Sequence, residues 1–158
     1  PIRGYIVGGP IYETSGSQVA IADLRERAES LGLGSRVGFT GFVADASSAI
    51  RSLDIVVHAS TDPEPFGLVI AEAMACGKPV VASRAGGAIE LTDACEHAMT
   101  HMPGDAAGLA KRIEELATDP GLRAHLGTSG RAAAERCFTR SRMAFELTPI
   151  YQELAHVH

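Results

Sequence analysis

The sequence predicts an α/β fold in which a doubly wound parallel sheet carries helices on both faces. Short apolar runs rich in β-branched residues alternate with longer segments of helical spacing. The strand-like runs are apolar throughout, which is typical of parallel strands that helices cover from both sides. With 158 residues, of which 46% are hydrophobic, the chain is long enough for one compact domain, and we expect a single domain over 1–158.

Three strands and two helices are predicted in residues 1–59. The runs 5–10 and 54–59 are apolar, and glycine and proline end the first of them. Asp45 is a good N-cap for a short helix. The predicted strands are 5–10, 37–41 and 54–59, and the predicted helices are 17–33 and 45–53.

The second half is expected to be mainly helical, with one more buried strand at 79–83. Gly77 ends a helix that begins at Phe66. Asp105 begins an amphipathic helix, because the apolar residues that follow it recur on one face. The predicted helices are 66–76, 105–118, 121–137 and 141–154.

Bulk properties exclude several classes of function. The net charge of −5 offers no broad attraction to nucleic acid, so no nucleic-acid partner is expected. Three cysteines, Cys76, Cys95 and Cys137, are odd in number and widely spaced, which favours reduced thiols and a cytoplasmic location. No signal peptide or membrane-spanning run is visible, and the start without methionine suggests a fragment of a longer chain.

Two acidic residues occupy unusual places in the stretch 64–83. Glu64 stands directly before the helix predicted at 66–76, and Glu72 is the only charged residue between Pro65 and Gly77. We expect a helix of such apolar composition to be largely buried, together with Glu72. Because an unpaired buried carboxylate is costly, Glu72 then needs a partner.

The start of the same helix is suited to a phosphate group. A helix start exposes unpaired backbone N–H groups and the positive end of the helix dipole, and Gly67 leaves room for a ligand. Glu72 lies about one and a half turns further along and can reach a hydroxyl of a nucleotide whose diphosphate rests on the amides of Phe66, Gly67 and Leu68. Glu64 then faces whatever the diphosphate carries.

The run E-P-F-G-L-V-I-A-E-A-M-A-C-G-K-P-V-V-A-S resembles the retaining glycosyltransferases of GT-B architecture, which have two Rossmann-like domains. Glu64 and Glu72, with seven residues between them, match the E-x7-E signature of that family. The segments 37–43, 84–90 and 103–105 resemble its flanking segments. The resemblance implies a Rossmann-like, nucleotide-sugar-binding C-terminal domain that lacks its first strand-helix unit.

The resemblance also implies roles for individual residues. Glu64 acts as the catalytic residue and contacts the donor sugar, whereas Glu72 contacts the ribose hydroxyls. The diphosphate rests on the segment Phe66, Gly67, Leu68 and Val69, and Val43 and Asp45 border the base. Further contacts are expected from Gly8, Gly9, Arg84, Gly86 and Gly87. A UDP- or GDP-linked sugar is the expected substrate, with no metal and no cofactor, and the acceptor is a glycan, a lipid or a small molecule.

The sequence departs from the family pattern in two places. Nothing before Tyr5 supplies the strand and the Arg and Lys that neutralise the diphosphate in family members, and 93–102 lacks the expected glycines. We therefore expect a missing N-terminal domain as a partner. Contact with a membrane surface is expected only through that missing half. The isolated chain is expected to catalyse nothing. Either another segment or another chain fills the place of the first strand, or the strands at Tyr5 and Asp54 become direct neighbours.

Other interpretations stay open at this point. Gly8-Gly9 and Gly86-Gly87 fit ordinary turns as well as ligand contacts, and Arg84 fits a surface residue as well as a ligand. Among the histidines, His58 is expected to be a packed residue, and we expect Cys95, His97 and His101 to lie in a surface loop rather than at a metal. The rival functions are a non-catalytic nucleotide-binding or assembly module and a sugar-nucleotide epimerase of related architecture.

Overall fold

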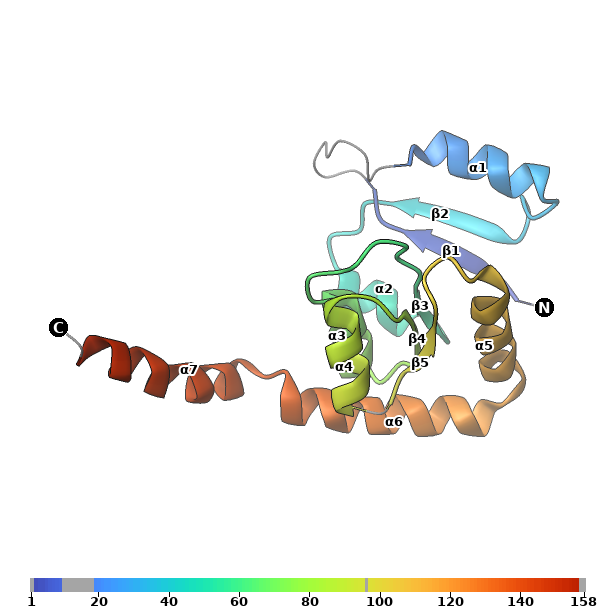
Figure 1. The fold of residues 1–158 in the computed structure, drawn as a ribbon. Helices are drawn as coiled ribbons and strands as arrows, with labels where there is room; N and C mark the ends of the chain where they lie inside the picture. The colour runs from blue at the N-terminus through green and yellow to red at the C-terminus, as the bar shows by residue number, and fades with distance from the viewer. Residues whose placement is uncertain (1, 10–18, 96, 157–158) are drawn as a thin grey trace. The chain divides into compact units, whose positions relative to one another are not determined.

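A computed structural model describes residues 2–9, 19–95 and 97–156, with the side chains of all of these except 94 and 95. The chain divides into two compact units, Pro1–Ala49 and Ile50–His158, which we call the first and second units. The fold is α/β with parallel strands throughout the two sheets, which confirms the predicted fold class (Figure 1).

The first unit contains a two-stranded sheet. Strand β1 (Gly4–Val7) pairs in parallel with β2 (Val37–Gly41), and helix α1 (Ile21–Ser30) connects them. The guanidinium of Arg25 on α1 lies 4.7 Å from the centre of the Phe39 ring on β2, a cation–π contact between the helix and the sheet. Helix α2 (Ala46–Arg51) follows and runs across the boundary between the units.

The second unit is built on a three-stranded parallel sheet with the order β3-β4-β5. Helices α3 and α4 lie on one side of this sheet and α5 on the other, while α6 runs along its lower end in the view of Figure 1. The strands are β3 (Val56–His58), β4 (Val80–Ser83) and β5 (Met99–His101). The helices are α3 (Leu68–Ala75), α4 (Gly87–Cys95), α5 (Ala106–Thr118), α6 (Pro120–Cys137) and α7 (Arg140–Ala155).

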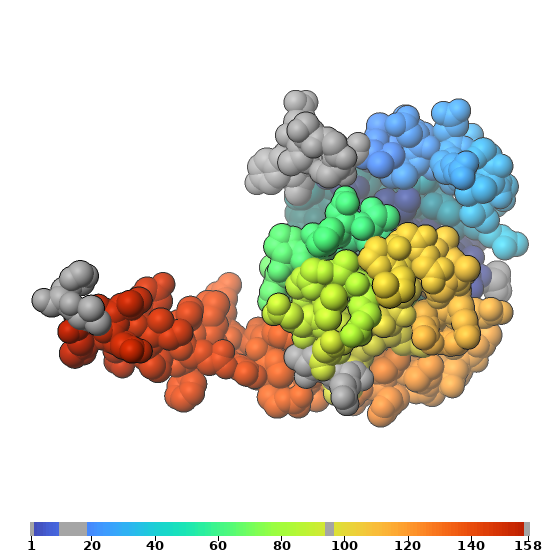
Figure 2. All heavy atoms as spheres, in the orientation of Figure 1, coloured from blue at the N-terminus to red at the C-terminus, as the bar shows by residue number. Residues whose placement is uncertain are grey.

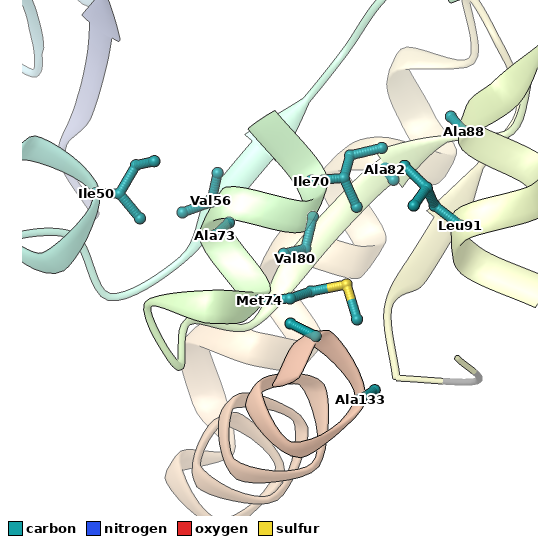
Figure 3. Close-up of a cluster of buried hydrophobic side chains, with 11 residues drawn as sticks. Ile50, Val56, Ile70, Ala73, Met74, Val80, Ala82, Ala88, Leu91 and Ala133 are labelled. Atoms are coloured by element: carbon teal, nitrogen blue, oxygen red, sulfur yellow. The ribbon is translucent and has the colours of Figure 1, made fainter. Parts of the chain in front are cut away.

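The core of the second unit forms where α3 packs on β3, β4 and α6. All four residues of β4 are buried, and Ile70 and Met74 of α3 have no exposed surface (Figure 3). Helix α6 approaches the end of α3 closely at Gly127, where a Cβ would collide with the Gly77 carbonyl oxygen. Gly130 also faces α3, and a Cβ there would make an ordinary contact of 3.6 Å with Cγ of Met74.

Several local predictions are confirmed by hydrogen bonds. Asp45 accepts the Ser48 amide at 2.9 Å, and Asp105 accepts the Gly108 amide at 2.9 Å, so both carboxylates cap the helices that follow them. The strand at 37–41 has the predicted bounds. Gly77 follows α3 with a φ of 70°, the left-handed conformation that ends many helices.

Two elements, α4 and β5, are missing from the prediction. Helix α4 opens at Gly87, where a glycine pair resembles a turn, and β5 has only three residues, two of them polar. The expectation that His101 lies in a surface loop is wrong, because it ends β5 with 7% of its surface exposed.

The described strands form two sheets, one in each unit. β1 pairs with β2 in the first unit, and β3 pairs with β4 in the second. Both expectations for the place of the first strand stay predictions: that another segment or chain fills it, or that the strands at Tyr5 and Asp54 are direct neighbours.

Helix α7 contributes no side chain to the core. None of its residues is buried, and Met143, Phe145 and Tyr151 are more than half exposed. In Figure 2 the helix extends away from the rest of the second unit. Across the described residues, no helix combines the length and the apolar character that crossing a bilayer requires.

Candidate functional site

The start of α3 depends on glycine at position 67. Gly67 is buried, with φ 87° and ψ 51°, a left-handed conformation that other residues adopt only with strain. A Cβ there would also lie 3.0 Å from Cδ1 of Ile70. The Ile70 amide donates to the Gly67 carbonyl at 2.9 Å, whereas the described residues offer no backbone acceptor to the amides of Leu68 and Val69. Two N–H donors are therefore available at this helix start.

Glu72 lies on the exposed face of α3, so the expectation that this side chain is buried is wrong. Leu68 is 59% exposed and Val69 is 37% exposed, and Glu72 follows them one turn later on the same side. In the described part of the chain, the Glu72 carboxylate has no hydrogen bond or ion pair. An exposed carboxylate is solvated and needs no protein partner, and it can meet a ligand that lies along this face.

A close approach of two backbone segments holds Glu64 in place. Glu64 forms a parallel β-bridge with Gly86, and its carbonyl accepts the Gly87 amide at 2.6 Å. A Cβ at Gly86 would collide with the Glu64 carbonyl oxygen, and one at Gly87 would collide with that of Pro65. This packing alone accounts for both glycines, because no larger residue fits either position.

The Glu64 side chain is directed toward a buried histidine. Oε1 of Glu64 lies 3.7 Å from Nε2 of His58, and the two side chains are 35% and 6% exposed. This distance is longer than a hydrogen bond. His58 ends β3, and its carbonyl oxygen lies 3.4 Å from Nε2 of His101. His58 is packed, as the sequence predicts, and only the loop geometry shows its proximity to Glu64.

Arg84 is exposed and already has an ion-pair partner. Its guanidinium makes two parallel hydrogen bonds to Asp93, at 2.8 and 3.1 Å. It also lines an open hollow of about 230 Å³ together with Asp105, Lys111 and Arg112. Arg112 in turn pairs with Glu115, at 2.9 Å. The cations of this hollow are thus partly neutralised, and neither Glu64 nor Glu72 lines it.

Four of the predicted site residues belong to the first unit. Gly8 donates its amide to Gly41 at 3.0 Å and has a φ of 131°. Gly9 and Val43 are half-buried, and Asp45 is exposed. The carboxylate of Asp45 also accepts the Ser47 hydroxyl at 2.8 Å and the Ser48 hydroxyl at 2.6 Å, so it serves as the cap of α2. Contact of these residues with a base or a phosphate stays a prediction.

The second unit thus gathers the central predicted residues around one helix start. Glu64, Gly67 and Glu72 are joined there by Phe66, which is 48% exposed and meets Phe138 edge-on at 6.3 Å between ring centres. Three metal-binding side chains do not come together anywhere among the described residues.

Comparison with known proteins identifies one family, and the family model and the curated relatives agree on it. Residues 5–133 match the family model described as Glycosyl transferases group 1. The chain is 36% identical over 124 residues to a putative glycosyltransferase, EpsD, of Bacillus subtilis, covering 78% of this chain and 32% of that protein. It is 34% identical over 118 residues to the lipopolysaccharide core biosynthesis glycosyltransferase LpsE of Rhizobium meliloti, covering 75% of this chain and 34% of LpsE. The chain therefore spans about a third of the length of these curated relatives.

Solved structures agree with this result. The fold is similar to that of Anabaena HepE in a complex with UDP, with a TM-score of 0.87 and 35% identity over 96% of this chain and 41% of HepE. HepE has also been solved with UDP-glucose, and that structure gives a TM-score of 0.85.

Proposed function

Because the chain belongs to the family of glycosyl transferases group 1, we propose that it is the donor-binding domain of a retaining enzyme that transfers a hexose from a nucleoside diphosphate to an acceptor. The observation that carries the proposal is the start of α3. There, two available amides, a required glycine and two glutamates lie within nine residues of each other. The whole enzyme's activity and acceptor are part of the proposal, since this chain spans only about a third of its curated relatives.

In this proposal the diphosphate rests on the amides of Gly67, Leu68 and Val69. The helix dipole and the available N–H groups attract the anion. Glu72, one turn further along the exposed face, accepts hydrogen bonds from the ribose hydroxyls. Glu64 accepts them from the hydroxyls of the sugar. The UDP complexes of HepE support a UDP-linked donor for this chain, with GDP as the alternative.

The proposed mechanism uses electrostatic stabilisation rather than a covalent intermediate. The leaving phosphate takes the proton of the acceptor hydroxyl on the same face of the sugar, so the anomeric configuration is kept. The main contribution of the protein is then to stabilise the departing diphosphate. Hydrogen-bond donors that point at the negative charge developing in the transition state do this effectively. Arg84 pairs with Asp93 in this structure, and the resemblance to the family implies that further positive charge comes from a part of the enzyme outside this chain. The isolated chain is therefore expected to bind donor and to transfer nothing.

The rival functions explain less. The family model and the similar glycosyltransferases favour transfer over both. A cytoplasmic location, with contact to the inner membrane face through other parts of the protein, stays a prediction.

Isothermal titration calorimetry of the chain with UDP, GDP and UDP-glucose tests the proposal. Glu72→Gln keeps the size of the side chain and removes its charge. Charged hydrogen bonds contribute about 1.5–3 kcal/mol, so we expect UDP affinity to fall at least tenfold. Glu114→Gln is the matched control, since Glu114 is exposed on α5 and loses the same charge. Equal affinity in all three proteins contradicts the ribose assignment.

A further inference from the structure

We propose that His58 is a positioning residue for Glu64: its Nε2–H holds one carboxylate oxygen of Glu64, so that the other oxygen points toward the donor sugar. The inference rests on the proposed function, because it assigns His58 a task at that same site. No role in contacting the donor is assigned to His58 itself.

The first observation is the state of the imidazole ring. His58 is 7% exposed, and both of its ring nitrogens are buried. Neither nitrogen makes a hydrogen bond to any other described group. Buried polar atoms in folded proteins are nearly always paired, because leaving one unpaired costs free energy. A ring that only filled space at this place would be better replaced by phenylalanine or leucine.

The second observation is the direction of the ring. Of the described acidic side chains, the one recorded against His58 is Glu64, with Oε1 at 3.7 Å from Nε2. An N–H···O hydrogen bond to a charged oxygen has a heavy-atom distance of about 2.7–2.9 Å. A shift of about 1 Å in the Glu64 side chain therefore converts the present contact into a charge-assisted hydrogen bond. The tautomer that permits it carries its proton on Nε2.

The third observation is that both backbones are fixed, so that only side-chain torsions need to change. Glu64 is held by the Gly87 amide and by its bridge to Gly86. His58 is held in the ladder with β4, where it lies opposite Ala82. Its carbonyl oxygen also faces Nε2 of His101, at 3.4 Å. The Glu64 side chain is 35% exposed, so it is only partly packed. A buried donor on a hydrogen-bonded strand can thus select one rotamer of a partly exposed carboxylate.

The test measures how much the sugar adds to nucleotide binding. Calorimetry gives the dissociation constants of UDP and UDP-glucose, and their ratio isolates the contacts made by glucose. In the proposal Glu64 contacts only the sugar, so we expect Glu64→Gln to change the ratio and to leave UDP affinity within twofold. His58→Phe is expected to change the ratio at least threefold in the same direction, again without altering UDP affinity.

Two further variants separate positioning from packing. His58→Gln keeps an amide N–H at about the reach of Nε2, and it should restore the ratio to within twofold of the parent. The double variant His58→Phe/Glu64→Gln should match Glu64→Gln alone, because His58 acts only through that carboxylate. His125→Gln, at an exposed position on α6, controls for the loss of a histidine and should leave both constants unchanged.

A spectroscopic measurement covers the case in which His58→Phe does not fold. Ring ¹⁵N spectra of the chain without ligand should show His58 protonated on Nε2. That resonance should shift in Glu64→Gln, whereas the His125 resonances should not. An unchanged His58 resonance overturns the inference.

The outcomes distinguish this inference from the proposed function. If the parent chain binds neither UDP nor UDP-glucose, the proposed function fails and the inference falls with it. If Glu64→Gln changes the ratio while His58→Phe does not, the function stands and the positioning role is wrong. A His58→Phe variant that weakens UDP and UDP-glucose equally also overturns the positioning role, since a general packing defect has that effect.

Discussion

Both faces of α3 carry apolar side chains, but one face packs into the protein and the other is exposed. On the inner face, Ile70, Ala73 and Met74 have no exposed surface and pack into the core of the second unit. On the outer face, Leu68 and Val69 are exposed although they are equally apolar, and Glu72 lies beside them. The apolar residues of the two faces are similar in type, and they differ in whether the side chain points into the core or toward solvent. The inner face holds the fold, and the outer face leaves the amides at the helix start and the Glu72 carboxylate open to a ligand.

The largest effect is expected from truncation on the inner face. Met74→Ala removes a fully buried side chain that packs toward α6 and should lower the free energy of unfolding by about 2–5 kcal/mol. Urea unfolding followed by circular dichroism measures the change. In the folded fraction, UDP affinity should stay within twofold of the parent. A loss of less than about 0.5 kcal/mol would mean that the inner face does not carry the fold.

An intermediate effect is expected where the Glu64 loop meets the start of α4. Gly86→Ala places a Cβ against the Glu64 carbonyl, at a backbone φ of 59°. Strain of this kind costs about 1–3 kcal/mol. Because the strain also displaces Glu64, the ratio of the UDP and UDP-glucose dissociation constants should change as well. Ala85→Gly, a neighbouring change without added bulk, should leave that ratio as it is in the parent.

The smallest effect is expected from truncation on the outer face. Leu68→Ala removes a side chain that is 59% exposed, and stability should change by no more than about 0.5 kcal/mol. The same urea titration compares it directly with Met74→Ala. A destabilisation as large as that of Met74→Ala would show that both faces of α3 stabilise the fold, which contradicts the difference between them.

Much of the fold was predictable because its signals are local. Asp45 and Asp105 precede their helices as capping residues, and Gly77 ends α3, so each boundary is marked by one side chain and its immediate neighbours. Strand β5 carries no such signal. It has three residues and takes its place in the sheet from pairing with β4, a long-range contact that periodicity does not reveal.

The sequence indicates which residues come together at the start of α3 but not their geometry, and their contact with a ligand stays a prediction. The expected burial of Glu72 was inferred from the apolar composition of α3. The spacing of Ile70, Ala73 and Met74 already defines an inner face that excludes it. The contact between Glu64 and His58 could not be predicted from the sequence, because His58 is six residues away and the loop between them sets their distance. Contacts made through a loop depend on its path, which the packing of Gly86 and Gly87 decides.

That packing has a consequence for protein engineering. Any library that diversifies the loop around Glu64, the residue proposed to contact the sugar, is constrained by two positions more than twenty residues downstream. Randomising 86 and 87 together with the loop would fill the library with misassembled members, because almost any side chain there collides with the loop backbone. Keeping both glycines fixed would concentrate the search on variants in which the loop retains its path.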